Sequence, residues 1–144
     1  MTTDLQTARA GLLSGQPSGV SPDSELAMRV IPMPADSNAN GDIFGGWIMA
    51  QVDLAGAVLA SRIARGRIVT VAVNQFIFKQ PVSIGDLLSF YARVERIGRS
   101  SVTVHMEVYA ERNPEDPVVA KVTEASLTNV AIDRQGNKRE IPHD

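Results

Sequence analysis

The sequence predicts a two-layer α+β domain in which one long apolar helix is covered by an antiparallel sheet. Three observations lead to this prediction: an apolar segment of helical length at 45–65, a series of period-two segments after it, and short connections between those segments. Short connections join antiparallel neighbours, and a sheet of this size curls over a single helix. The 144 residues suffice for one domain with one core.

The first 25 residues are predicted to form a flexible tail, with a short helix around 5–13. They are rich in Ser, Thr, Gly, Pro and Gln and lack a regular apolar period. The folded domain is therefore expected to span 26–144. Its first strand is predicted at 26–33, where Pro32 and Pro34 stop it.

The segment 45–65 is predicted to be a helix that other structure surrounds, because it is apolar almost all round. Arg62 and Arg65 suit the negative end of its dipole, and Gly66 is placed to end it. Gln51 and Asp53 interrupt its apolar run, which favours a buried helix over a membrane span.

Four long strands are predicted after the helix, arranged as a meander. Their β-branched and alternating residues occupy 67–78, 87–97, 100–111 and 118–132. A single helix leaves one face or edge of such a sheet uncovered, so we expect a homo-oligomer.

Composition narrows the classes of function. The formal charge of −2 argues against nucleic acid as the partner, since phosphate binding leaves a basic footprint. The chain contains no cysteine, which excludes disulfides, a cysteine nucleophile and cysteine metal ligands, and fits a cytoplasmic protein. The N-terminus lacks the pattern of a signal peptide.

Most catalytic motifs are absent from the sequence. There is no Gly-x-Ser-x-Gly elbow, no phosphate-binding Walker loop and no His-Glu-x-x-His. The two histidines are His105, expected to be a solvated residue on the polar face of a strand, and His143, in the terminal tail. We therefore expect neither a metal site nor a Ser-His-Asp triad.

The remaining candidate for chemistry is the start of the helix. Asp42 precedes Gly45 and Gly46, where backbone N–H groups at a helix N-terminus could polarise a carbonyl oxygen while the acid activates water. The alternative, which spacing alone favours, is that Asp42 only caps the helix. Asp53, inside the helix, is expected to reach solvent or a subunit interface rather than to act in catalysis.

The same region resembles a known family. The block Asn38-Ala39-Asn40-Gly41-Asp42-Ile43-Phe44-Gly45-Gly46-Trp47 is similar to the signature of bacterial broad-specificity acyl-CoA thioesterases. These enzymes belong to the hotdog-fold superfamily, with the cytosolic acyl-CoA hydrolases of animals. The likeness covers about residues 28 to 142 and continues through 66–71, 81–86, 98–101 and 130–142.

The resemblance implies a hotdog fold, with one long buried helix wrapped by a five-stranded antiparallel sheet. It implies a dimer whose sheets join, assembled further into a hexamer, with the acyl chain between subunits beside strand 67–78. Asp42 would be the general base or nucleophile on the thioester of an acyl-CoA, and the N–H groups of Gly45 and Gly46 would hold the thioester oxygen. No cofactor is implied, because CoA is part of the substrate.

Further substrate contacts follow from the same resemblance. Asn40 matches the family block, although it could serve only to shape the loop. Arg99, with Ser100, is the first candidate for the CoA phosphates; the alternative is that Arg99 is an ordinary exposed turn residue.

Two other functions fit a hotdog domain. One is a non-catalytic acyl-CoA-binding regulatory module, which the intact Asp42 disfavours. The other is a dehydratase of fatty-acid synthesis, which uses a histidine together with an acid, and His105 is a poor match for that role. Fold alone does not choose among these functions. The acid followed by two glycines favours the hydrolase. We expect this enzyme to be soluble, with no membrane or nucleic-acid partner.

Overall fold

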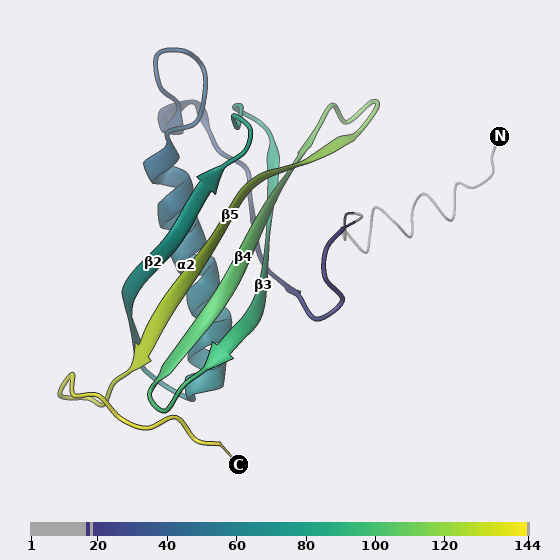
Figure 1. The fold of residues 1–144 in the computed structure, drawn as a ribbon. Helices are drawn as coiled ribbons and strands as arrows, with labels where there is room; N and C mark the ends of the chain where they lie inside the picture. The colour runs from purple at the N-terminus through teal and green to yellow at the C-terminus, as the bar shows by residue number, and fades with distance from the viewer. Residues whose placement is uncertain (1–16, 18, 144) are drawn as a thin grey trace.

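The computed structural model describes residue 17 and residues 19–143, so the helix predicted at 5–13 lies outside the described residues. Within them the chain forms one long helix and a five-stranded antiparallel sheet that curves around it, as predicted (Figure 1). The elements in order are β1 (Glu25–Val30), a short 3-10 helix η1 (Pro34–Asp36), α2 (Gly45–Ala64), β2 (Ile68–Phe78), β3 (Leu87–Ile97), β4 (Ser101–Arg112) and β5 (Val118–Ala131).

The strand order is β1-β3-β4-β5-β2, so the expected four-strand meander is wrong for one strand. β3, β4 and β5 do form a meander, but β2 pairs with β5 and not with β3. The eight residues 79–86 between β2 and β3 are long enough to cross to the other side of the sheet. This loop thereby lies beside the start of α2, where Ile43 N donates to Val82 O at 2.8 Å.

Element boundaries agree with the sequence to within a few residues. β1 ends at Val30, before the predicted stop, because Pro32 has no N–H to contribute to the ladder. The helix ends at Ala64, where Arg65 adopts a left-handed conformation with φ 53° and Gly66 N donates to Ser61 O at 3.2 Å.

The core lies between one face of α2 and the concave face of the sheet. The buried helix residues are mostly small, and Gly56 allows the sulfur of Met106 to approach its backbone. The buried residues of α2 are Ile48, Val52, Ala55, Gly56, Ala60 and Ala64. By length and composition α2 also resembles a membrane span, but core helices of soluble domains pass the same test.

In a single protomer the sheet covers one side of the helix and leaves the other side open. Leu54 is 61% exposed on the side of α2 that the sheet does not cover. The adjacent sheet edge, formed by β2, exposes Val71 at 57%, with Val69, Val73, Ile77 and Phe78 also open to solvent. An edge strand with unpaired backbone groups and apolar side chains is suited to pair with another chain.

Candidate active site at the start of the core helix

Asp42 is held by a turn that the side chain of Asn38 organises. Asn38 Oδ1 accepts the N–H groups of Asn40 at 2.9 Å and Asp42 at 3.1 Å, and Asn38 N donates to Asp42 O at 2.7 Å. Gly41 has a φ of 85°, which favours glycine there. Asn40 is exposed and contributes its backbone to this turn, so Asn38 is the side chain that shapes the loop.

The start of α2 is not capped by Asp42. Its N-cap residue is Phe44, no side chain among the described residues caps it, and its first turn holds no acid. The helix-cap interpretation of Asp42 is therefore wrong. Since the first N–H groups of a helix have no intrahelical acceptor, those of Gly45 and Gly46 are free to bind a carbonyl oxygen.

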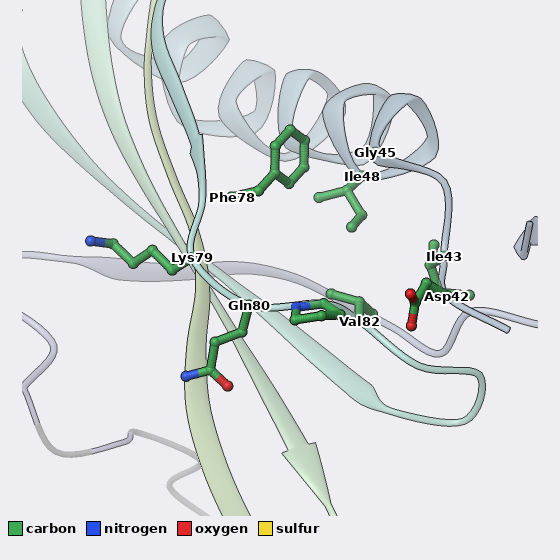
Figure 2. A pocket seen from close by; sticks show the side chains of 9 residues that line it. Asp42, Ile43, Gly45, Ile48, Phe78, Lys79, Gln80 and Val82 are labelled. Carbon is green, nitrogen blue, oxygen red and sulfur yellow. The ribbon is translucent and has the colours of Figure 1, made fainter. Parts of the chain in front are cut away.

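A cavity of about 350 Å³ lies beside these groups. Figure 2 shows the Phe78 ring next to Gly45 and Ile48, with the Asp42 carboxylate on the side of Val82. Lys79 points away from the carboxylate, and its ammonium group lies 3.4 Å from Glu124 Oε2. The site therefore combines a carboxylate, free backbone donors and an apolar wall. Its lining residues are Asp42, Ile43, Gly45, Ile48, Phe78, Lys79, Gln80, Pro81 and Val82.

A second carboxylate, Asp53, has a defined partner. It is exposed in the protomer, as predicted, but Thr70 Oγ1 on β2 lies 2.7 Å from its Oδ1. Thr70 Oγ1 also lies 3.0 Å from Oδ1 of the buried Asn129 on β5. The sequence indicates only that an acid interrupts an apolar helix, because its partner comes from a strand 17 residues away.

Arg99 and Ser100 lie at the opposite end of α2 from Asp42. Arg99 is 84% exposed, and its Nε lies 2.7 Å from Glu140 Oε1. The two residues border a second cavity of about 360 Å³, together with Lys138, Arg139 and Glu140. Arg139 contacts Gly66, just beyond the end of α2. A 20-residue helix is about 30 Å long, so one protomer does not bring Arg99 to Asp42.

His105 is not the solvated side chain that the sequence predicts. Only 14% of it is exposed, and its Nε2 lies 3.2 Å from Glu124 Oε1 on the sheet face that points away from α2. His105, Glu107 and Glu124 together resemble a set of metal ligands. The ammonium group of Lys121, however, lies 2.5 Å from Glu107 Oε2 and 3.0 Å from Glu124 Oε1, so it already pairs with both acids.

Comparisons with known proteins agree with this architecture. Residues 40–116 match the model of the thioesterase superfamily. The chain is 46% identical over 123 residues to the acyl-CoA thioester hydrolase YciA of Escherichia coli, covering 84% of this chain and 93% of that protein.

Solved structures of acyl-CoA thioesterases have the same fold as this chain. An aspartate-to-alanine mutant of HI0827, a hexameric broad-specificity acyl-coenzyme A thioesterase, superposes with a TM-score of 0.80 at 44% identity, covering 83% of this chain and 88% of that one. A threonine-to-alanine mutant of an acyl-CoA hydrolase from Staphylococcus aureus gives 0.75 at 26% identity, covering 83% and 73%. The chain belongs to the thioesterase superfamily of hotdog-fold proteins.

Proposed function

We propose that this protein hydrolyses acyl-CoA thioesters to a free acid and CoA. The observation that carries the proposal is the meeting, at an apolar cavity, of a carboxylate with an uncapped helix N-terminus that begins with two glycines. The YciA relative is an acyl-CoA thioester hydrolase, and the two enzymes share 46% identity. Water is the only other reactant, and no cofactor is needed.

In the first form of the mechanism, the N–H groups of Gly45 and Gly46 bind the thioester oxygen and stabilise the charge that develops on it. Asp42 removes a proton from water as the water oxygen bonds to the carbonyl carbon. The carbon–sulfur bond then breaks, and the thiolate of CoA takes up the proton. As a nucleophile, Asp42 would instead bond to the carbonyl carbon, and the carbon–sulfur bond would break to release the thiolate of CoA and leave a mixed anhydride. Water would then hydrolyse this anhydride to the free acid and the Asp42 carboxylate, and the proton from water would go to the thiolate.

Asp53 is a second candidate for the catalytic carboxylate, and its bond to Thr70 favours it. A hydroxyl donor fixes one carboxylate oxygen and leaves the other available to activate water. An aspartate and a threonine are also the residues replaced in the HI0827 and Staphylococcus aureus mutants.

If Asp53 is the catalyst, two copies of the chain must build one site. Asp53 lies eight residues beyond Gly45, about 12 Å along the helix, too far to act on a carbonyl bound at the N-terminus of its own helix. A second copy paired antiparallel at β2 would bring its helix start towards this Asp53. We therefore include in the proposal a dimer joined at β2 and assembled into a hexamer, the state described for HI0827.

The same arrangement gives a role to the second cavity, which Arg99 and Ser100 border. Arg99 and Ser100 of one copy would bind the phosphates of a CoA whose thioester reacts at the other copy's helix, because they lie beyond the far end of a helix that is about 30 Å long. Asn40, exposed in the loop before the helix, would contact the substrate at the cavity mouth. A cytoplasmic location is part of this proposal, since the chain has no cysteine.

Two matched substitutions test the proposal and separate the two carboxylates. Asp42→Asn and Asp53→Asn are assayed for free-thiol release from a series of acyl-CoA chain lengths. The variant at the catalytic acid should lose about 10²–10⁴-fold in kcat. The other should keep most of its turnover, and both should keep their melting temperature and their assembly by light scattering. Full turnover in both variants would refute catalysis by either acid. Acyl-CoA binding by the unaltered protein without any thiol release would favour the non-catalytic binding module.

A further inference from the structure

A buried amide lies behind the Asp53–Thr70 pair. Asn129 on β5 is only 2% exposed and sits directly opposite Thr70 on β2 and Val102 on β4. Its neighbours along the helix-facing side of β5 are the buried apolar residues Leu127 and Ala131. A buried polar side chain in such a position requires a hydrogen-bonding partner. The partner that the structure provides is the hydroxyl of Thr70.

The two contacts of Thr70 determine how the amide must be oriented. The hydroxyl oxygen lies 2.7 Å from Asp53 Oδ1 and 3.0 Å from Asn129 Oδ1, but a hydroxyl has a single proton to donate. The ionised carboxylate is the stronger acceptor and takes that proton. The structure places the amide oxygen of Asn129 next to Thr70. The oxygen and nitrogen of an amide are interchangeable in such an assignment, and exchanging them lets Nδ2–H₂ donate to Thr70 while Thr70 donates to Asp53. The result is a chain of donors from Asn129 through Thr70 to Asp53.

We infer that Asn129 is a positioning residue that directs the hydroxyl proton of Thr70 onto Asp53. The inference rests on the proposed function in the form in which Asp53 is the catalytic acid. Without the amide, the Thr70 hydroxyl is free to rotate about its Cβ–Oγ1 bond, and the carboxylate loses the fixed orientation that leaves one oxygen for water. Hydrogen bonds in such a chain also strengthen one another.

The test combines Asn129→Leu, Thr70→Val and the double variant in the full-length assembled protein. Leucine has a similar size and lacks the amide, so the core stays filled. Asn129→Leu should lower kcat about 5- to 10-fold, the scale of one lost hydrogen bond, with little change in KM. In the Thr70→Val background the same substitution should have almost no further effect, because Asn129 acts through Thr70.

Thr128→Val serves as the matched control. Thr128 is adjacent on β5 but faces the other side of the sheet, where its hydroxyl lies 3.0 Å from that of Thr103. This variant should leave kcat unchanged and set the scale of the melting-temperature change for a lost hydrogen bond on this strand.

The inference is overturned if Asn129→Leu leaves kcat unchanged, or if it lowers kcat equally with and without Thr70. A fall in the melting temperature alone would assign Asn129 a structural role only. Full activity of Asp53→Asn would refute the Asp53 mechanism itself. The activity of this single variant is measured separately from the Asn129 and Thr70 variants, so the two failures can be distinguished.

Discussion

The ring of Phe78 on β2 packs against the first residue of the core helix, Gly45. A Cβ atom added to Gly45 would lie 3.2 Å from Cζ of the ring. Phe78 also lies 5.0 Å from Phe76, measured between ring centroids, and Phe76 packs on the core. The aromatic pair thus ties the edge strand to the place where the free backbone donors lie.

The two glycines at the helix start should respond differently to alanine. Gly46→Ala meets no atom within 4 Å and should stabilise the protein by roughly 0.5–1 kcal/mol, because alanine is less flexible when unfolded. Gly45→Ala must displace the Phe78 ring, so its gain should be smaller or negative. Denaturant unfolding of both variants provides the measurement. Equal stabilisation would show that the ring moves without cost.

The charged network around Glu124 should make stability depend on pH in the acid range. Burial raises the pKa of Glu124, but hydrogen bonds and charge from Lys121, with a further bond from Lys79, outweigh it and hold the pKa below its ordinary value. A lowered pKa contributes stability above the ordinary value of 4.5, and this contribution is lost as pH falls through the folded value.

Glu124→Gln should therefore lower stability at pH 7 by about 0.5–1.5 kcal/mol, with a smaller difference from the unaltered protein at pH 3. Melting temperatures at both pH values provide the comparison. Glu115→Gln, in the exposed turn between β4 and β5, is the control. It should leave the melting temperature unchanged at both pH values. A difference that stays constant with pH would mean that the charge of Glu124 is not the cause.

Arg99 should affect the KM values of all acyl-CoA substrates alike. If it binds CoA phosphates, Arg99→Ala raises KM by a similar factor for every acyl length, because the contact is the same in the ground state and the transition state. The factor should shrink as salt rises. Glu140→Gln releases Arg99 from its present partner and should lower KM under the same conditions. An unchanged KM in Arg99→Ala would assign Arg99 to an ordinary exposed turn.

The β2 edge is the expected joint between copies. Val71→Lys places a charge at the most exposed apolar position of that strand and should shift light-scattering masses towards the monomer, with loss of activity. Val118→Lys introduces the same charge at an apolar site on β5 that is 48% exposed, and should leave the mass unchanged. A Val71→Lys protein of unaltered mass would place the interface elsewhere.

Elements with a clear period were predictable from the sequence, whereas pairing and side-chain partners were not. The helix and strands follow from spacing, and the family block gave the hotdog fold. The pairing of β2 with β5 depends on a crossover that no local pattern records. The bond between Asp53 and Thr70 likewise depends on it, since β2 must lie beside the helix for the two to meet. His105 was misjudged because strand alternation shows which face a residue occupies, but not that Glu124 and Ser126 shelter it there.

The uncovered edge of β2 also has a consequence for any protomer that is separated from its assembly. Residues 68–73, Ile-Val-Thr-Val-Ala-Val, have high β propensity and carry neither charge nor proline, the composition of segments that aggregate when left unpaired. A protomer released by dilution would expose this segment and be open both to correct association and to irreversible aggregation. The shelf life of the protein is therefore expected to improve as its concentration rises, until collisions between unfolded chains dominate.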